Sequence, residues 1–455
     1  MLRTHAIAVA TLVTLFAVAA VPGHAQLPTH IPTIAQTERP ADDLDPTFGT
    51  NGQVISDLTN NTDAADAVLL PDDRILVLGT LFYPEGSTDG EGSDLMLMRF
   101  TSDGVPDPTF GENGIATANV AQGDKAQKLI IQPDNKIIAM GQNSVGTVEL
   151  ARFNPDGSLD TTFGNGGSTQ TWFNAHLFSS DYIELQPDNN ILLIGAISDL
   201  DLQTARYGFA RYDPDGNLDT NFGNNGLLIP DASNLVQAVT IKADGKILIA
   251  GETARFDSRD PDITVTRYNP DGTKDTEFGD DGIITMLANE TLQHLLFQEN
   301  NDLLAAMSIF PDGGSIDNDR DIALTKYRAD GSVDPDFRSN ETSSIDAGRL
   351  EQTVAITVSP TGQIILVGTT STGNSEFFDN FIVRYAPDGS IEGAITTDLG
   401  KEEIPCQVLI QSDGKFVVVG TTQDFAISDA GESDFFLLRY LNSPFNQVYL
   451  PLTSR

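Results

Sequence analysis

Short apolar segments alternate with turn-forming residues along almost the whole chain. Seven of these segments end in a basic residue followed by an aromatic one, and the pairs recur at intervals of about 57 residues. The pairs are Arg99-Phe100, Arg152-Phe153, Arg211-Tyr212, Arg267-Tyr268, Lys326-Tyr327, Arg384-Tyr385 and Arg439-Tyr440. Repeats of this length are typical of propellers and arrays, so residues 44–440 are predicted to form one repeated structure.

Each repeat contains four segments with the pattern of β-strands. The first begins at a glycine, as in residues 114–117, and the second runs into a tight turn such as residues 132–136. The third is apolar at successive positions and is predicted to end at a glycine, as in residues 137–141. A short run of this kind is expected in a sheet that is covered on both faces. The fourth segment carries the basic–aromatic pair and leads into a link such as residues 154–164.

These strands predict an all-β fold, a seven-bladed β-propeller of four-stranded antiparallel blades. Residues 44–49 have the pattern of a link whose own fourth strand is missing, and the last repeat stops at Tyr440 without a link. We therefore expect the N- and C-terminal segments to pair and close the ring. An open solenoid and two smaller sheet domains are the alternatives.

The repeated motifs resemble a known family. The link Leu-Asp-x-Thr-Phe-Gly, turns of the Pro-Asp-Gly-Lys type and the ending Arg-Tyr-x-Pro-Asp-Gly are similar to the delta-60 repeat of secreted bacterial proteins. The resemblance departs at residues 391–393, where a link lacks its aromatic residue, and at Met307, where a third strand lacks its glycine. It implies a propeller-like β fold and an extracellular location, and it implies no catalytic residues. Six links keep their phenylalanine: Phe48, Phe110, Phe163, Phe222, Phe278 and Phe337.

The formal net charge of −39 narrows the classes of partner. Nucleic acids and anionic membrane surfaces are disfavoured, because the chain has no basic stripe that could replace the counterions of phosphate groups. We expect an extracellular protein or glycan as the partner, and a monomeric protein. The single cysteine, Cys406, can form no internal disulfide, so packing must stabilise the fold.

The N-terminal residues have the pattern of a secretory leader. Arg3 precedes a nearly apolar stretch at residues 6–21, and residues 23–25 offer a cleavage site with small side chains. The protein is therefore predicted to be secreted to the extracellular space or the cell envelope, without membrane insertion after cleavage. An uncleaved membrane anchor is the alternative. The expected segments are a signal peptide at 1–25, a flexible leader at 26–43, the seven-repeat propeller at 44–440 and a C-terminal tail at 441–455.

One link carries oxygen-containing side chains at alternate positions, as calcium sites do. These residues are Asp213, Asp215, Asn217 and Asp219. Two equivalent links begin with Arg328 and Ala386, and neither side chain can bind a cation. A turn in which the aspartate bonds to its own backbone explains every copy, so we expect no cofactor, with calcium as the alternative.

The recurrent basic residue lies on an apolar strand, where its charge requires an acidic partner. We expect repeated structural ion pairs and aromatic residues in the core, rather than a ligand-binding ring with a platform for stacking sugars. The nearest repeated acids are Asp107, Asp160, Asp219, Asp275 and Asp334.

The connections between third and fourth strands vary in length, and several are acidic. Variable loops on a rigid scaffold commonly carry binding sites, so these loops are predicted to form the binding face. A solvated acidic rim is the alternative. The candidate ligand-binding acids are Asp257, Asp260, Asp262, Asp312, Asp317, Asp319, Asp321, Asp424, Asp429 and Glu432.

Signatures of catalysis are missing from the sequence. The repeat region has only His176 and His294, which are far apart, and it has no nucleophile elbow, phosphate loop or dinucleotide motif. The sequence therefore favours a secreted, non-enzymatic propeller scaffold that binds an unknown ligand through its acidic loops, with no catalytic residues. The alternatives are a polysaccharide-acting hydrolase or lyase that uses Asp or Glu at the central opening, and a calcium-dependent adhesion module.

Overall fold

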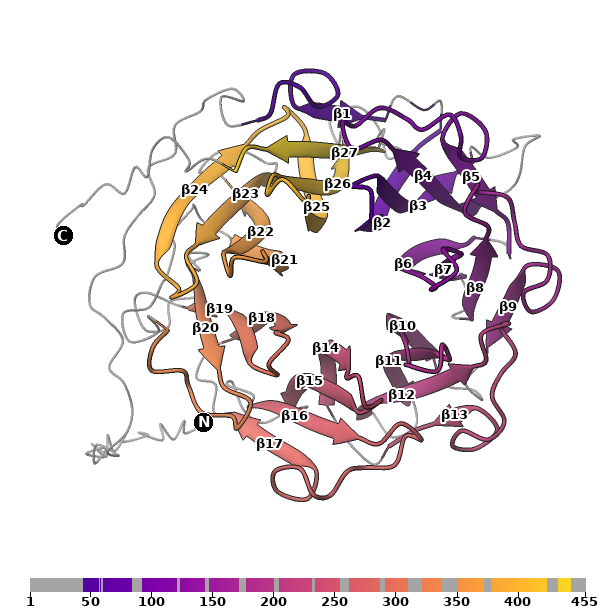
Figure 1. The fold of residues 1–455 in the computed structure, drawn as a ribbon, viewed down its shortest axis with the longest axis vertical. Helices are drawn as coiled ribbons and strands as arrows, with labels where there is room; N and C mark the ends of the chain where they lie inside the picture. Colours follow the sequence, from indigo (N-terminus) through magenta and orange to yellow (C-terminus); the bar gives the residue numbers. More distant parts are fainter. Residues whose placement is uncertain are drawn as a thin grey trace, which may run out of the picture.

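The repeats form a ring of seven β-sheets around a central axis (Figure 1). The predicted all-β, seven-bladed propeller is confirmed. Among the described residues, no helix is long and apolar enough to cross a membrane. The computed structural model describes residues 44–56, 58, 60–83, 92–120, 123–143, 147–171, 177–199, 204–230, 234–253, 262–286, 291–309, 321–337, 351–371, 378–423 and 433–442.

Each sheet runs from one strand beside the axis to an outer strand at the rim (Figure 1). In this order, the first three sheets are β2 (Thr62–Leu69), β3 (Ile75–Phe82), β4 (Ser93–Phe100) and β5 (Ile115–Ala118); β6 (Lys125–Ile131), β7 (Ile137–Gln142), β8 (Val148–Phe153) and β9 (Ser168–Thr171); and β10 (Leu177–Leu185), β11 (Ile191–Asp199), β12 (Thr204–Tyr212) and β13 (Leu227–Leu228). The fourth and fifth are β14 (Asn234–Ile241), β15 (Ile247–Thr253), β16 (Ile263–Tyr268) and β17 (Ile283–Met286); and β18 (Thr291–Phe297), β19 (Leu303–Ile309) and β20 (Asp321–Tyr327). The last two are β21 (Glu351–Val358), β22 (Ile364–Ser371), β23 (Phe378–Tyr385) and β24 (Ile391–Thr397); and β25 (Glu402–Ile410), β26 (Phe416–Gln423), β27 (Ser433–Tyr440) and β1 (Gln53–Ile55).

The seventh sheet takes its outer strand from the other end of the repeat region. β1 pairs antiparallel with β27, which gives the sheet order β1-β27-β26-β25. Leu44 adds a β-bridge to Tyr440, and the Asp45 N–H donates to the Arg439 carbonyl oxygen at 2.8 Å. Residues from both ends of the repeat region therefore make up one blade.

The core lies between neighbouring sheets, because the central strands are apolar on both faces. Successive side chains of a strand point to opposite faces. On β3, Leu76 and Leu78 pack against the second sheet, whereas Ile75 and Val77 pack against the seventh. All four side chains are at most 1% exposed. Each blade is thus held by the two blades beside it.

The third strand of the repeat continues past its glycine, so the predicted strand end is wrong. Gly79 lies inside β3, and a Cβ added there would come within 2.6 Å of the Asp63 carbonyl oxygen on the innermost strand. At this level the innermost strand has a β-bulge between Ala64 and Asp66. The glycine therefore makes room for a bulged neighbour. In the fifth sheet Met307 occupies the equivalent position and is 5% exposed.

The recurrent basic residues form the structural ion pairs that the sequence predicts. Arg99 Nε donates to Asp107 Oδ2 at 2.8 Å, and both side chains are at most 7% exposed. The guanidinium also lies 4.5 Å from the centre of the Phe110 ring and donates to the Pro155 carbonyl of the next link at 2.6 Å. Arg99 therefore ties its blade to the next one. The aromatic residue after each basic one is at most 3% exposed and belongs to the core. The other ion pairs are Arg152–Asp160, Arg211–Asp219, Arg267–Asp275, Lys326–Asp334, Arg384–Glu392 and Arg439–Asp45.

Candidate binding site at the central cavity

A cavity of about 380 Å³ lies at the centre of the ring, and all seven innermost strands contribute to its wall. Much of the wall is apolar, with Leu129, Ile183 and Leu295 among its residues. Ligand sites commonly have this size and combine an apolar wall with a few polar groups. The polar residues of the wall include Asp66, Lys128, Glu184, Gln237, His294 and Gln407.

One β-bulge at the same level of each innermost strand shapes this wall. The register shifts between residues 64/66, 126/128, 180/182, 236/238, 292/294, 353/355 and 405/407. Bulges redirect side chains and are frequent beside functional sites. The residue directly after the bulge lines the cavity in every strand, and these seven residues are named the bulge ring. Its members are Asp66, Lys128, Tyr182, Ala238, His294, Ala355 and Gln407.

Asp66 interacts with the bulge-ring residues of both neighbouring blades, Lys128 and Gln407. Asp66 Oδ2 accepts the Leu129 N–H at 3.0 Å, and Asp66 Oδ1 accepts a hydrogen bond from Gln407 Nε2 at 3.2 Å. Lys128 Nζ lies 3.6 Å from the same Oδ1 atom. These donors come from the blades on either side and offset the desolvation of a carboxylate that is 4% exposed.

Glu184 is an acid at a position where other blades carry apolar residues. It lies two positions beyond the bulge-ring residue of β10, and the equivalent residues include Val68, Ile130 and Leu296. Burial raises the pKa of Glu184 to about 7. The carboxyl group is therefore largely protonated below neutral pH and can donate a hydrogen bond into the cavity.

His294 and Cys406 are uncharged at neutral pH. Burial, with the charge of Lys128, lowers the pKa of His294 to about 4. Burial and the charge of Asp66 raise the pKa of the Cys406 thiol to about 12. A buried thiol in this state is a poor nucleophile. The arrangement at these two residues thus supports binding by hydrogen bonds and apolar contacts rather than attack on a substrate.

Replacing Glu184 with glutamine should change how stability depends on pH. Between about pH 4.5 and 7 the folded chain holds a proton at Glu184 that the unfolded chain releases, so wild-type stability falls as the pH rises through this range. Glu184→Gln should match the wild type at pH 4 and exceed it by roughly 2–3 kcal/mol at pH 8.

Urea unfolding at the two pH values measures this difference. Glu277→Gln, at an exposed link position, is the matched control and should track the wild type at both values. A Glu184→Gln variant with the same pH profile as the wild type would contradict the shifted pKa.

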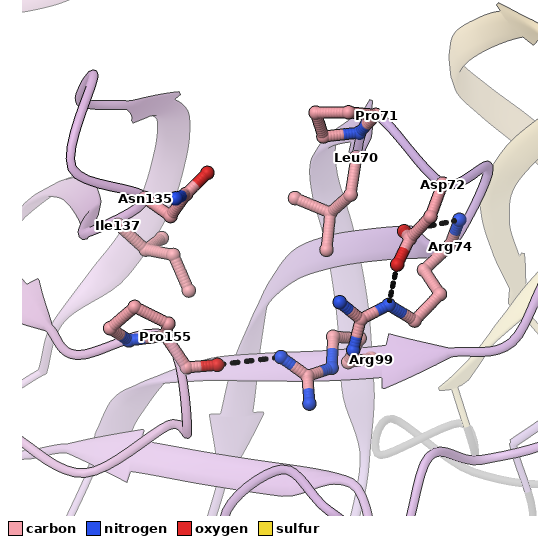
Figure 2. A pocket seen from close by; sticks show the side chains of 8 residues that line it. All are labelled: Leu70, Pro71, Asp72, Arg74, Arg99, Asn135, Ile137 and Pro155. Carbon is pink, nitrogen blue, oxygen red and sulfur yellow. Dashed lines mark hydrogen bonds and ion pairs between the residues drawn. The ribbon is translucent and has the colours of Figure 1, made fainter.

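A second hollow, of about 390 Å³, lies between the turns of the first and second blades (Figure 2). Its two cations are already neutralised. Arg74 Nε donates to Asp72 Oδ2 at 2.8 Å, and Arg99 bonds both Asp107 and the Pro155 carbonyl. This hollow therefore offers no strong site for an anion.

The link at residues 213–219 uses its oxygen atoms within its own turn. Asp213 Oδ1 accepts the N–H groups of Asp215 at 3.0 Å and Asn217 at 2.9 Å, and Asp213 Oδ2 accepts a bond from Asn217 Nδ2 at 3.0 Å. Asp219 Oδ2 lies 2.7 Å from Arg211 NH2. This geometry is that of a structural turn, and calcium binding by these residues stays a prediction.

Most of the acids predicted for the binding face lie outside the described residues. Asp262 directly precedes β16 and is partly exposed. Asp321 is the first residue of β20 and is 1% exposed, so it is a buried strand residue rather than part of a loop surface. The acids outside the described residues are Asp257, Asp260, Asp312, Asp317, Asp319, Asp424, Asp429 and Glu432.

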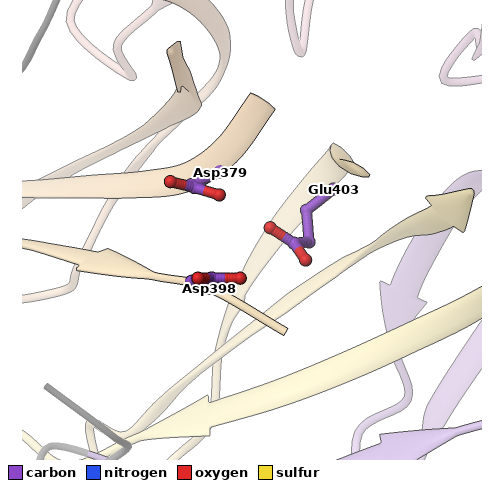
Figure 3. A group of neighbouring side chains, drawn as sticks. All are labelled: Asp379, Asp398 and Glu403. Carbon is purple, nitrogen blue, oxygen red and sulfur yellow. The ribbon is translucent and has the colours of Figure 1, made fainter. Parts of the chain in front are cut away.

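An aspartate recurs in five repeats near the start of the fourth strand, and the sequence patterns above identify two of its copies, Asp262 and Asp321, only as loop acids. It is found five positions before the basic residue, and aligning the repeats on that residue would have revealed it. In the sixth blade it joins a group of three acids, Asp379, Asp398 and Glu403, whose oxygen atoms lie within 4.8 Å of one another (Figure 3). Such an all-oxygen set is typical of sites for hard cations. The repeated aspartates are Asp94, Asp262, Asp321, Asp379 and Asp434.

Solved structures that resemble the chain are distant in sequence. The β-propeller domain of the trilobed protease from Pyrococcus furiosus is 10% identical, with a TM-score of 0.46, over 86% of this chain and 99% of that one. Drosophila semaphorin 1a, extracellular domains 1–2, is 8% identical, with a TM-score of 0.46, over 86% and 88%. A polysaccharide lyase of family PL25, an ulvan lyase, is 9% identical, with a TM-score of 0.44, over 85% and 96%. No curated protein matches the chain.

A family model matches most of the repeats. Its description is a domain of unknown function (DUF5122) β-propeller. The matched segments are residues 70–110, 132–163, 186–222, 242–278, 359–392 and 411–443. With the seven sheets, these matches identify the chain as a β-propeller repeat protein.

Proposed function

We propose that this protein is a secreted, non-enzymatic scaffold that binds an extracellular protein or glycan, with a polar group of the ligand held in the central cavity. The observation that carries the proposal is the variation within the bulge ring. Seven equivalent backbone positions line one cavity, yet they include an acid, a base, a tyrosine and a histidine, such as Asp66, Lys128, Tyr182 and His294. The structural ion pairs, by contrast, repeat in every blade. Variation at equivalent positions of a cavity wall is expected of a site that recognises an asymmetric ligand.

The bulge residue Gln237 provides a second argument for a ligand. It lines the cavity, and its Oε1 atom is buried without a hydrogen-bond partner among the described residues. A buried acceptor left unbonded costs about 1–3 kcal/mol, which a donor on the ligand would recover. The acidic loops would add a negative surface around the partner, as the sequence predicts, and the predicted leader supports secretion.

A binding screen with a matched pair of variants tests the proposal. The mature chain is screened by thermal shift against oligosaccharides and short peptides, and the affinity of each hit is measured by calorimetry. Gln237→Leu should weaken binding at least tenfold. Gln127→Leu is the control, because it makes the same change at the bulge of β6, and Gln127 does not line the cavity. Affinity that is unchanged in Gln237→Leu would contradict the cavity as the binding site.

The alternative function is that of a polysaccharide-acting enzyme. It is favoured by Glu184, a carboxyl group at the cavity with a pKa of about 7, which has the protonation state that a general acid requires. Oligosaccharides that bind are therefore also incubated with the protein and analysed for shorter products. If the protein is a non-enzymatic scaffold, no shorter oligosaccharides are formed. Product formation that is abolished by Glu184→Gln would establish the enzyme instead.

A further inference from the structure

We propose that Asp379, Asp398 and Glu403 form a calcium site at the junction of the sixth and seventh blades. Asp379 belongs to β23, Asp398 directly follows β24, and Glu403 belongs to β25. Figure 3 shows their carboxylate groups facing one another. The site is separate from the central cavity, and the proposal does not depend on ligand binding there.

The geometry of the oxygen atoms fits calcium. One oxygen from each of the three side chains lies within 4.8 Å of the other two. Calcium binds oxygen at about 2.3–2.6 Å, so two ligands on opposite sides of the ion are about 4.6–5.2 Å apart. The three oxygens can therefore surround a single ion. Asp398 is exposed, so water molecules can complete the coordination from the solvent side.

The equivalent position in the first blade carries an amide in place of the third acid. There, Asn119 Nδ2 donates to Asp94 Oδ1 at 2.7 Å, so an amide satisfies the repeated aspartate. Asn119 directly follows β5, just as Asp398 follows β24. The chain therefore has an acceptor in the sixth blade where it has a donor in the first.

In both blades, an acid five positions after this residue accepts a backbone N–H from the residue that follows it. Asp124 Oδ2 accepts the Val120 N–H at 2.9 Å, and Glu403 Oε1 accepts the Leu399 N–H at 3.0 Å. The backbone frame is thus retained while the donor side chain is replaced by a third acid. A bound cation would supply the positive charge that the amide hydrogen supplies in the first blade.

Glu403 is a buried side chain that is only half satisfied. It is 0% exposed, and its Oε2 atom has no hydrogen-bond partner within the described part of the chain. The Nζ atom of the nearby Lys401 lies 3.9 Å from Asp434 Oδ2, on β27.

Calcium titration of the mature chain tests the site. The protein is treated with EDTA, dialysed and titrated with calcium chloride by calorimetry, and its melting temperature is measured with and without calcium. We expect one ion per chain and an increase in melting temperature of about 2 °C or more at saturation, because the ion binds only the folded state.

Two matched variants locate the ion. Asp398→Asn introduces the amide found at Asn119, so it should preserve the fold and weaken calcium binding at least tenfold. Asp213→Asn makes the same change in the other candidate metal site and should bind calcium like the wild type. Glu403→Gln, tested in the same way, replaces Asp398→Asn if that variant does not fold.

Three outcomes would overturn the proposal. The wild type could show neither binding heat nor a change in melting temperature. Asp398→Asn could bind calcium as tightly as the wild type. Asp213→Asn could abolish binding while Asp398→Asn does not, which would place the ion in the link turn.

Discussion

Replacing Arg439 with methionine should lower the free energy of unfolding by about 3–5 kcal/mol. Arg439 NH2 lies 2.9 Å from Asp45 Oδ2, and both side chains are 3% exposed, so the variant leaves a buried carboxylate without its arginine. It also removes the hydrogen bond that Arg439 NH1 donates to the Ser102 carbonyl of the first blade at 2.7 Å. The substitution therefore weakens the contact between the first and seventh blades. Methionine keeps an apolar stem of similar length, which limits the loss of packing.

Chemical unfolding followed by circular dichroism measures this loss, and Arg267→Met is the matched control. Arg267 Nε pairs with Asp275 Oδ2 at 2.7 Å, but its side chain is 29% exposed. Each aspartate also has a lysine partner, Lys246 for Asp275 and Lys415 for Asp45, so the pairs differ mainly in burial and position. Arg267→Met should lower the free energy of unfolding by about 1 kcal/mol. If both variants lowered the free energy of unfolding equally, the greater burial of the Arg439 pair would not explain its contribution to stability.

The contribution of the Arg439 pair should also depend on pH. Burial opposes ionisation of Asp45, but hydrogen bonds from Thr47 and the charges of Lys415 and Arg439 lower its pKa to about 2. A carboxyl group with a lowered pKa stabilises the fold above its unfolded pKa, near 4, and this stabilisation is lost as the pH falls towards 2. The difference between wild type and Arg439→Met should therefore shrink over the same range.

Truncating Phe163 to alanine should destabilise the fold by about 3–5 kcal/mol, because it leaves a cavity that the surrounding sheets cannot fill. Phe163 is 0% exposed, and the Arg152 guanidinium lies 4.7 Å from the centre of its ring. The next blade approaches the ring through Gly216, where an added Cβ would come within 2.6 Å of it. Gly216 has a φ of 84°, which also favours glycine.

Phe278→Ala is the control for this truncation. Phe278 occupies the same position in a later link, with the Arg267 guanidinium 4.4 Å from its ring centre, but it is only partly buried. Phe278→Ala should lower the free energy of unfolding clearly less than Phe163→Ala does, as measured by urea unfolding under the same conditions. If both truncations cost the same, burial between the blades does not determine the contribution of the link phenylalanine.

The blades could be predicted from the sequence because each repeat carries the same set of interacting residues. The pair Arg99-Phe100 and its partner Asp107 recur at fixed spacing, and each requires the others, since a buried guanidinium needs a nearby carboxylate. Even the link without an aromatic residue follows this rule, because β24 supplies Glu392, whose Oε2 lies 3.0 Å from Arg384 Nε. Residue patterns that recur at fixed spacing in every blade can therefore be recognised in a single sequence.

The site could not be predicted in the same way, because it depends on differences between repeats. A β-bulge has no strong local signal, and the glycine that accompanies it, such as Gly79, reads equally well as the end of a strand. Asp379 and Glu403 lie on strands of two different sheets and Asp398 directly follows β24, so their proximity emerges only from the ring. Pattern reasoning identified the scaffold, and only the three-dimensional arrangement revealed the cavity wall and the group of acids.

The origin of the seventh sheet has a consequence for biosynthesis. The partner of β27 is β1, near the start of the repeat region, so the sheet cannot be completed until the last repeat has been made. During synthesis, the early segment keeps an unpaired strand edge while the six intervening blades assemble. Completion of the fold is then a late event that depends on contacts between distant parts of the chain, which typically makes folding slow. A chain whose synthesis stops before Tyr440 lacks a complete β27. The apolar surface between its first and seventh blades would then remain accessible to chaperones and proteases.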